Sequence, residues 1–344
     1  LSTEGPQKLR LSATDLYLGV TALVDAEVKK GGSIALSART LFDIVKNLPE
    51  GEVRLALGDT HSVELSCGKV RYRIPAMPGE DFPPLPNAGE AEFVDLDANV
   101  LTELIGLTQY SMSHDDTRPH LAGTLFEGEG KIVRMVTTDG HRLSKAEQSP
   151  GTEAGKMSFS MLIPHKGISE LKRLLDDVRS SKGKSEEPGT VGVATAGGNA
   201  FFRREDLCLS VKLADEHFPP YNKVIPTKQE RTVVAARGPL VEALRRISLV
   251  ASDKSGGVQL QIEPGMLRLQ SQNPDVGEGT EEVDVDYAGE GLKIGFNAKY
   301  LLDTLTALPH DEIALELSGD RDPGVVKPIG DSGDFVGVIM PMRI

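Results

Sequence analysis

The chain of 344 residues contains no tryptophan, and aromatic residues make up only 5% of it. Proteins that bind single-stranded nucleic acid without sequence preference stack bases on aromatic side chains, so this scarcity argues against that class. No apolar run approaches the roughly 20 residues that a membrane-spanning helix needs, and we expect no membrane partner. The length suits two or three domains of roughly 100–150 residues each.

Cysteine is almost as scarce, with Cys67 and Cys208 as the two examples. Neither belongs to a CxxC pair and both lie in strand-like sequence. We therefore predict two buried thiols in a reducing cytosol, ahead of a disulfide. The histidines have no metal-ligand spacing with each other or with the cysteines, so the sequence predicts no metal and no other cofactor.

Basic residues are outnumbered, with 38 Lys and Arg against 51 Asp and Glu and a net charge of −13. A protein that offers its whole surface to nucleic acid is expected to be basic. If DNA is a partner of this chain, the basic residues of the protein must therefore be gathered on one surface.

The common catalytic motifs are also missing. Neither GxGxxG nor GxSxG occurs, and Gly183-Lys184-Ser185 lacks the earlier glycine of a phosphate-binding loop because Val178 stands there. The sequence thus favours a protein without an active site. An enzyme stays open as an alternative, in which repeated α/β units enclose a substrate cleft and His141 is the general base.

Internal repetition is the most informative feature that is present. Residues 34–57, IALSARTLFDIVKNLPEGEVRLAL, recur as 294–317, IGFNAKYLLDTLTALPHDEIALEL, and a middle copy, LIPHKGISELKRLL, begins at residue 162. Each copy is typical of a strand, a helix and, in the first and third, a proline stop before a second strand. The VRLAL alternation in the first copy predicts a half-buried strand. The chain therefore contains one unit three times.

Further repeated segments complete the unit. KLRLSATDLYL (8–18), KIVRMVTTDGHRL (131–143) and MLRLQSQNPDV (266–276) each predict a strand broken at a turn. The stretches 80–86 and 216–226, EDFPPLP and EHFPPYNKVIP, predict extended linkers because consecutive prolines cannot continue a ladder. We predict an α+β fold of three domains, each with two helices packed on antiparallel sheets, at residues 1–88, 89–226 and 227–344. A Gly/Ser/Lys/Glu-rich loop is expected at 180–190.

The first copy is incomplete in its helices. The second helix of the unit is predicted at 97–109 and 238–250, and its first counterpart would precede residue 1. We therefore expect about 40 residues of the first domain, a helix and a strand, to be missing upstream, which would leave an apolar face of that domain uncovered.

Charge is distributed unevenly among the predicted elements. Bases outnumber acids in 161–184 and 235–254, whereas 277–290 contains acids and no base. Arg39 and Lys46 share a helix face, as do Lys166 and Arg173. Charges on one exposed helix often do no more than solvate it, but recurrence on equivalent helices of an acidic chain favours a surface that attracts phosphates without reading bases. The predicted DNA-facing residues are Arg39, Lys46, Lys166, Lys172, Arg173, Arg245, Arg246 and Lys299.

Two local features are not explained by the repeat alone. Asp139-Gly140 suits a tight hairpin, but the neighbouring His141 and Arg142 have no such structural reason. The chain ends in Val338-Ile339-Met340-Pro341-Met342-Arg343-Ile344, which is more apolar than a free end usually is. It is either a last strand or part of an adaptable apolar groove, a use for which methionine is suited.

These segments resemble the bacterial DNA sliding clamp, the β subunit of DNA polymerase III. The likeness rests on LAGTLFE (121–127), TDGHRL (138–143), FPPYNKVIP (218–226), IGFNAKYLLDTL (294–305) and the terminal MPMRI, in the same order over essentially the whole chain. The resemblance implies a non-catalytic processivity factor, in which two subunits pair head to tail into a ring around duplex DNA. Helices would line the hole, sheets would form the wall, and an ATP-dependent clamp loader would open and close the ring.

The resemblance also implies a pocket for a short peptide with a Gln and apolar residues, carried by DNA polymerase and by other replication and repair proteins. The implied pocket residues are Leu121, Thr138, Gly140, His141, Arg142, Leu143, Pro219, Lys223, Val224, Asn297, Tyr300, Val338, Met340, Pro341, Met342 and Arg343. Lys223 stands where relatives have Arg, and Ser255 where they have an aromatic residue. By the same resemblance, Tyr72 and Ile74 meet Leu249 and Val250 of a second subunit, and the protein is cytoplasmic and associated with the nucleoid.

A third interpretation is a purely structural repeat protein whose acidic surface binds basic partners. It predicts no basic helix surface, whereas the clamp interpretation requires one. A polar cavity at His141 would favour the enzyme, and an apolar groove open to solvent would favour the clamp.

Overall fold

The computed structural model describes residues 1–58, 61–115, 117–152, 155–180, 189–251, 256–330 and 334–343, without the side chains of 177–180. Residues 181–188 of the predicted loop, Gly183-Lys184-Ser185 among them, and Ser255 lie outside the described residues. The chain forms two compact units, Leu1–Phe93 with Val191–Lys212, and Val94–Thr190 with Leu213–Ile344. We call them unit 1 and unit 2 and describe each by itself.

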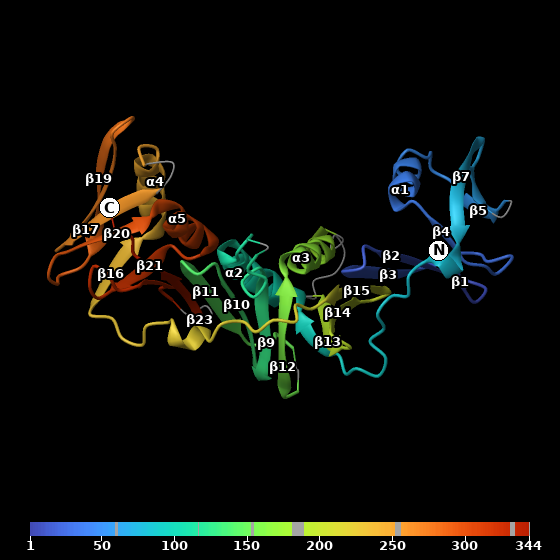
Figure 1. The fold of residues 1–344 in the computed structure, drawn as a ribbon, viewed down its shortest axis with the longest axis horizontal. Coiled ribbons are helices and arrows are strands. Elements are labelled where there is room, and N and C mark those ends of the chain that lie inside the picture. Colours follow the sequence, from blue (N-terminus) through green and yellow to red (C-terminus); the bar gives the residue numbers. More distant parts are fainter. Residues whose placement is uncertain are drawn as a thin grey trace. The chain divides into compact units, whose positions relative to one another are not determined.

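Unit 1 is built from antiparallel strands and one α-helix (Figure 1). One sheet has the order β1-β2-β3-β15-β14-β13, and a smaller sheet has the order β4-β7-β6-β5. The elements are β1 (Ser2–Glu4), β2 (Lys8–Thr14), β3 (Leu18–Asp25), β4 (Ile34–Leu36), α1 (Ala38–Lys46), β5 (Val53–Leu57), β6 (Ser62–Cys67), β7 (Val70–Pro78), the 3₁₀ turn η1 (Gly79–Asp81), β13 (Thr190–Ala196), β14 (Asn199–Arg204) and β15 (Leu207–Lys212).

Helix α1 begins where the sequence predicts, because the Ser37 hydroxyl accepts the Thr40 amide at 3.3 Å as an N-cap. None of its residues is buried, and Phe42 is 63% exposed. Strand β5 is exposed along its whole length, so the prediction of a half-buried strand is wrong. No described element covers this face of the first repeat.

Unit 2 contains the third repeat and the part of the second repeat outside residues 191–212. Most of its strands form one sheet. Its order is β12-β9-β10-β11-β23-β22-β21-β16-β19-β18-β17-β20. The elements are β8 (Val94–Asp97), α2 (Ala98–Thr108), η2 (Gln109–Ser111), β9 (Gly123–Gly130), β10 (Ile132–Thr138), β11 (Arg142–Gln148), β12 (Met157–Pro164), α3 (His165–Ser180), η3 (Tyr221–Lys223), β16 (Arg231–Ala236), α4 (Arg237–Ser248), β17 (Gly257–Glu263), β18 (Met266–Asn273), β19 (Gly277–Asp286), β20 (Leu292–Asn297), α5 (Ala298–Ala307), β21 (Glu312–Leu317), β22 (Gly324–Pro328) and β23 (Asp334–Ile339).

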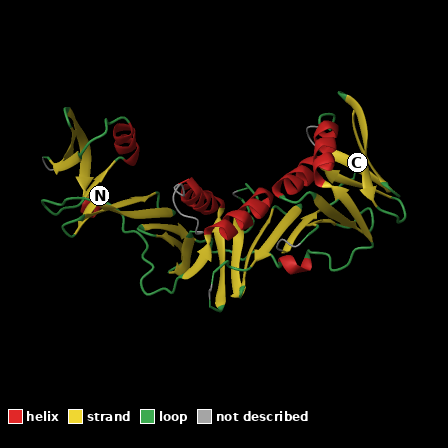
Figure 2. Cartoon of the chain, turned by 180° about the vertical axis from the view of Figure 1, so that it is seen from behind, coloured by secondary structure: helices red, strands yellow, loops and turns green. Residues whose placement is uncertain are grey.

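The α-helices of unit 2 lie on one side of its sheet, as the predicted helix and strand faces require (Figure 2). Asp97 caps α2 through the Asn99 amide, and Asn297 caps α5 through the Lys299 amide. Leucines of α4 and α5 pack together with strand residues into one apolar core. Its lining includes Leu240, Leu244, Leu260, Leu267, Leu301 and Leu305. Burying each such side chain contributes about 1.5–3 kcal/mol, which fixes the helices on the sheet.

The predicted α+β fold is therefore confirmed, and the second helix of the unit is present in the second and third repeats as α2 and α4. The linkers differ in detail, because each contains a short 3₁₀ turn, η1 or η3, instead of being extended throughout. Cys67 and Cys208 are free thiols, as predicted, although Cys208 is half-buried. No helix in the described ranges is long and apolar enough to cross a membrane.

Candidate functional site

A rigid turn joins β10 to β11 in unit 2. The Asp139 carboxylate accepts the backbone amides of His141 and Arg142 at 2.8 and 3.0 Å, and the Thr138 hydroxyl donates to the Arg142 carbonyl at 2.6 Å. Gly140 has φ +91°, which glycine adopts without strain. The prediction that Asp139 and Gly140 shape a tight hairpin is confirmed.

The same turn recurs in unit 1, between β2 and β3. Asp15 accepts the amides of Tyr17 and Leu18, and the Thr14 hydroxyl donates to the Leu18 carbonyl at 2.6 Å. Here Leu16 takes the place of Gly140 at φ +76°, with a side chain that is 72% exposed. The backbone that Gly140 leaves bare therefore carries a bulky apolar side chain in the first repeat.

Strand β23 binds the turn of unit 2 to the C-terminal segment. β23 pairs antiparallel with β11, with Arg142 opposite Ile339 and Leu143 opposite Val338. Just beyond the strand, the Met340 amide donates to the His141 carbonyl at 2.9 Å. The apolar terminus is therefore a last strand up to Ile339, followed by a segment that lies beside the turn. That Met340 and Met342 line an apolar groove stays a prediction.

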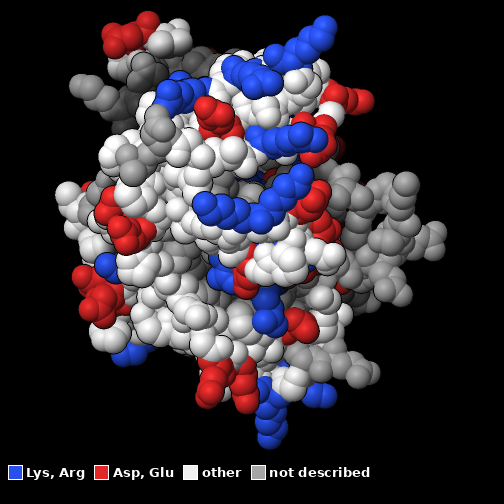
Figure 3. Space-filling model, turned by 90° about the vertical axis from the view of Figure 1, so that its right-hand side faces the viewer, with Lys and Arg blue, Asp and Glu red and all other residues white. Residues whose placement is uncertain are grey.

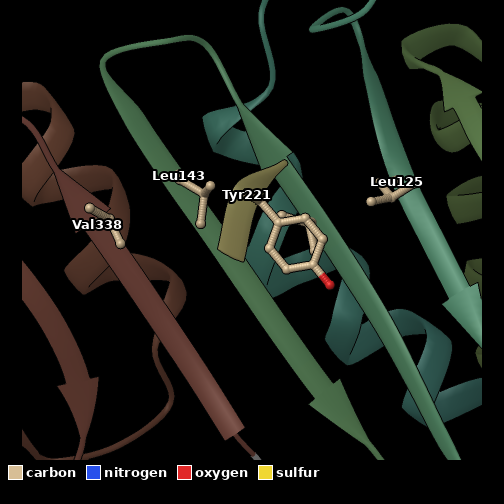
Figure 4. Close-up of a cluster of buried hydrophobic side chains, with 5 residues drawn as sticks. Leu125, Leu143, Tyr221 and Val338 are labelled. Carbon is tan, nitrogen blue, oxygen red and sulfur yellow. The ribbon is translucent and has the colours of Figure 1, made fainter. Parts of the chain in front are cut away.

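An apolar cluster is formed by side chains of β9, β10, β11, β23 and η3 (Figure 4). Its buried members are Leu125, Val136, Leu143, Tyr221 and Val338, with Phe218, Ile225 and Val336 packed against them. Two neighbours in sequence remain exposed, Val224 at 45% and Met340 at 41%. Exposed apolar side chains next to a packed cluster are suited to hold an apolar ligand.

Tyr221 anchors the linker over this cluster through its hydroxyl. That hydroxyl donates to Glu127 at 2.9 Å and accepts from Arg134 at 3.3 Å. Burial and the neighbouring Glu127 raise the pKa of Tyr221. Arg134 also donates to Glu147 at 2.5 Å, and Lys145 lies 2.9 Å from the same carboxylate. A network of hydrogen bonds and ion pairs thus holds the linker on the sheet.

Glu147 makes this anchorage sensitive to acid. Burial acts to raise its pKa, but Arg134 and Lys145 outweigh burial and lower the pKa below the ordinary 4.5. A lowered folded-state pKa adds stability above about pH 4.5, and this stability is lost as the pH falls through the folded value. We expect Glu147→Gln to lower the free energy of unfolding by about 1–2 kcal/mol at neutral pH. Its urea midpoint should also depend less on pH than that of wild type below pH 4.5. The control is Glu129→Gln, at a side chain 82% exposed; equal acid slopes in wild type and Glu147→Gln would refute this role.

Arg142 is the most completely engaged side chain of the region, with 8% of it exposed. It donates to Asp139 at 3.1 Å, to Asp303 at 2.7 Å and to the Tyr110 carbonyl at 2.6 Å. Its guanidinium also lies over the Tyr300 ring, 4.5 Å from the centroid. Arg142 therefore fixes the turn to α5 and η2.

All of the predicted pocket residues lie in unit 2, but they differ in access. Leu121, Thr138, Arg142, Leu143 and Val338 are buried; Pro219, Asn297, Tyr300, Pro341 and Met342 are half-buried; and Gly140, His141, Lys223, Val224, Met340 and Arg343 are exposed. Direct contacts connect several of them, among them the His141 and Tyr300 rings, stacked with centroids 6.4 Å apart. The Met342 amide donates to the carbonyl of Gly295 in β20 at 2.8 Å.

Sequence reasoning missed four residues that shape this region. Tyr110, Tyr221 and Asp303 make the contacts given above, and Arg118 donates to the Asp139 carbonyl at 3.1 Å. The repeat carried a signal for Asp303, because Asp43 holds the same position in the first copy. Arg118 also pairs with Asp115 at 2.9 Å, and its contacts suit support of the turn.

The predicted DNA-facing bases lie on helices, and all but Lys172, which is half-buried, are exposed. Several have acidic neighbours: Arg173 pairs with Glu170, Arg245 with Glu242, Arg246 with Glu281, and Lys299 with Asp303. Arg39 and Lys46 are both on α1 in unit 1. The face of unit 1 drawn in Figure 3 also shows a gathering of Lys and Arg among scattered acids.

The four residues assigned to a subunit interface divide between the units. In unit 1, Tyr72 is 41% exposed, whereas its neighbour Ile74 is buried. In unit 2, Leu249 just after α4 is 78% exposed and Val250 is half-buried. Among the described residues, no group of three His, Cys, Asp or Glu side chains is placed to hold a metal ion.

Repeated α+β units with bases along their helices and an apolar site beside a rigid turn are features of a DNA-clamp protein. Three family models match the chain: the DNA polymerase III beta subunit N-terminal domain at residues 3–86, its central domain at 95–220 and its C-terminal domain at 222–343. The chain therefore belongs to the family of DNA polymerase III beta subunits, the bacterial sliding clamps.

Individual proteins agree with this assignment. The beta sliding clamp of Pseudomonas putida is 32% identical over 339 residues, which cover 98% of this chain and 89% of that protein. The beta sliding clamp of Caulobacter vibrioides is 33% identical over 351 residues, covering 100% and 91%. A crystal structure of the DNA polymerase sliding clamp from Pseudomonas aeruginosa with ligand has a TM-score of 0.91 at 32% identity, covering 100% and 91%.

Family membership decides between the three interpretations. A sliding clamp is a processivity factor and a non-catalytic subunit of the polymerase, so this chain is not an enzyme. The alternatives of an enzyme with His141 as general base and of a purely structural repeat protein are therefore wrong.

Proposed function

We propose that this processivity factor holds its partner proteins in the apolar cleft formed by the Thr138–Leu143 turn, η3 and the segment after β23. The observation that carries this proposal is the pair of exposed side chains, Val224 and Met340, beside a fully packed cluster. A short peptide with a Gln and apolar residues suits such a cleft, because few polar groups are needed to orient it. The polymerase, the clamp loader and other replication and repair proteins would share this one site.

The Lys and Arg residues on the helices form the proposed DNA-facing surface. They are exposed and carry positive charge, and the acids paired with several of them moderate its strength. Contact of this kind is made to phosphates and is independent of base sequence. Weak, interchangeable phosphate contacts suit a protein that must move along duplex DNA while it encircles it.

Two open strand edges support head-to-tail pairing of two copies. β4 covers only Ala76–Pro78 of β7, and β16 pairs with β19 only at Val285 and Asp286, so the remainder of each strand has one edge free among the described pairings. The free part of β7 carries Arg71 and Arg73, and that of β19 carries Glu278 and Glu282, all exposed. Opposite charges on two free edges favour pairing between copies.

Apolar contacts accompany these edges. Tyr72 and Ile74 lie on β7, and Val250 lies close to Gly279 on β19, within 3.0 Å of the position that a Cβ there would take. We propose that Tyr72 meets Leu249 and Val250 of the second copy. Ile74 is not part of this proposed contact, because it is buried within its own unit and only 3% exposed. Contacts of this heterologous kind close into a ring when the rotation between copies permits it.

Domain boundaries near residues 88 and 226 and a place at the nucleoid complete the proposal. As a clamp of DNA replication the chain is assigned to the bacterial cytosol. Encirclement of chromosomal DNA would keep it at the nucleoid.

Topological linkage is the test. We expect the dimer, loaded by clamp loader and ATP on a nicked circular duplex, to co-migrate with the circle in gel filtration and to leave it when the circle is cut once. Leu249→Asp, a change at a 78% exposed side chain, should leave each subunit folded but abolish retention, because it puts a charge into the proposed interface. Equal retention on linear and circular DNA, lost at higher salt, would mean ordinary electrostatic binding and would refute the ring.

A further inference from the structure

Asp303 on α5 accepts hydrogen bonds from two cations through one oxygen atom. Its Oδ2 lies 2.7 Å from Nη1 of Arg142 and 2.7 Å from Nζ of Lys299. The three side chains differ sharply in access: 8% of Arg142, 25% of Asp303 and 71% of Lys299 is exposed. One carboxylate thus stands between a buried base and a solvent-facing base.

The buried base, Arg142, is connected to the proposed peptide cleft through its contacts with the turn. Arg142 also binds Asp139, and the Asp139 carboxylate holds the amides of the turn whose His141 carbonyl receives the Met340 amide. The Tyr300 ring lies against both the Arg142 guanidinium and the His141 ring. The position of this guanidinium therefore sets the shape of the turn beside Met340.

The solvent-facing base, Lys299, belongs to the proposed DNA-facing surface. Lys299 is in the first turn of α5, four residues before Asp303 and on the same helix face. Since most of it is exposed, its ammonium group can leave Asp303 for a phosphate at small cost. Arg142 has no such freedom, because its other contacts are also filled.

We propose that Asp303 is a positioning residue that couples DNA binding at Lys299 to peptide binding at the turn. A carboxylate oxygen shared by two cations divides its interaction between them. When a DNA phosphate takes Lys299, Asp303 interacts with Arg142 alone, holds the turn more firmly and leaves the cleft better ordered for a peptide. The inference rests on the proposed function, since it needs both the peptide cleft and the DNA surface.

The coupling should be modest and reciprocal. Exposed ion pairs have small energies, so we expect a peptide to bind about two- to fivefold more tightly to clamp on DNA than to free clamp. By linkage, the peptide should favour the DNA-bound state by the same factor. A clamp that engages partners slightly better once it encircles DNA would reduce their capture by clamp free in solution.

The experiment compares one peptide on free and DNA-linked clamp. The probe is fluorescein-labelled Gln-Leu-Ala-Leu-Phe, and the DNA-linked sample is clamp on a nicked circular duplex, freed of loader by gel filtration. Fluorescence anisotropy gives the two dissociation constants per clamp, and their ratio is the coupling. We expect Lys299→Ala to bind the peptide without DNA as tightly as wild type does on DNA, so that its ratio falls to one.

Two further variants distinguish coupling through Asp303 from a general effect of weaker DNA contact. Asp303→Asn should weaken the peptide in both states and also give a ratio of one. Arg173→Ala, which removes an exposed base paired with Glu170 in α3, should weaken DNA contact but keep the wild-type ratio. A wild-type ratio in Lys299→Ala, or a ratio of one in wild type itself, overturns the coupling even if the peptide binds in the cleft. If Met340→Asp leaves peptide binding unchanged, the proposed cleft itself is wrong, which is a different failure.

Discussion

Replacing Val224 and Met340 together by aspartate is expected to weaken peptide binding more than about a hundredfold. Both side chains are more than two-fifths exposed, so neither is needed to hold the fold together. In the complex they would be covered by the apolar part of the peptide, where an unpaired carboxylate loses its hydration. Each such burial costs on the order of 1–3 kcal/mol, and the lost apolar contact adds to it.

The measurement is anisotropy of the labelled pentapeptide with the clamp dimer, and the control is Val276→Asp. Val276 is 61% exposed and lies in the turn between β18 and β19, the third-repeat counterpart of the Thr138–Leu143 turn. The control should bind the peptide like wild type and carry the same type of substitution. Retention on circular DNA should be preserved in both variants. Peptide binding that both leave intact would place the partner site elsewhere on the molecule.

The repeat and its helices could be predicted from the sequence because they depend on local patterns. Leu41, Ile44 and Val45 show helical spacing whether or not anything covers them, and Asp139-Gly140 requires a tight turn whatever surrounds it. Burial is not local in this sense. The VRLAL alternation of β5 correctly gave a strand, but half-burial also requires a covering element, and no described element covers it.

The environment of Arg142 could not be predicted, because its partners come from distant parts of the chain. Tyr110 is 32 positions away and Asp303 is 161 positions away, and β11–β23 pairing brings the third repeat next to the turn. The sequence singled out Arg142 as unexplained and the resemblance placed it in the pocket. The structure adds that its donors are directed inward to Asp139, Asp303 and the Tyr110 carbonyl.

The ion-pair partner of Lys299 could not be predicted from the sequence either. Helix periodicity places it on an exposed face, which is correct, but cannot show that Asp303 shares its oxygen with a buried arginine. Counting bases on helices therefore overstates the positive potential of the surface. Acids such as Glu170, Glu242 and Glu281 take part of that charge in the absence of DNA.

Arg142→Ala is expected to destabilise the second and third repeats by roughly 3–5 kcal/mol, because removal of one partner of a buried ion pair leaves the other uncompensated. Asp139 would keep only its backbone donors and Asp303 only Lys299, and the Tyr110 carbonyl would lose its donor. Arg142→Lys should recover only part of the loss. A lysine cannot donate to three separated acceptors from a planar group or stack flat on the Tyr300 ring.

Urea unfolding followed by circular dichroism measures the loss, and hydrogen exchange at the His141 and Arg142 amides locates it. Both amides donate to Asp139, so faster exchange there would show that the turn has loosened before the sheet unfolds. Arg173→Ala is the matched control, since Arg173 is 76% exposed and its pair with Glu170 should contribute less than about 1 kcal/mol. If Arg142→Ala were as mild as this control, the guanidinium would not be holding the turn to α5, and the coupling through Asp303 would lose its physical basis.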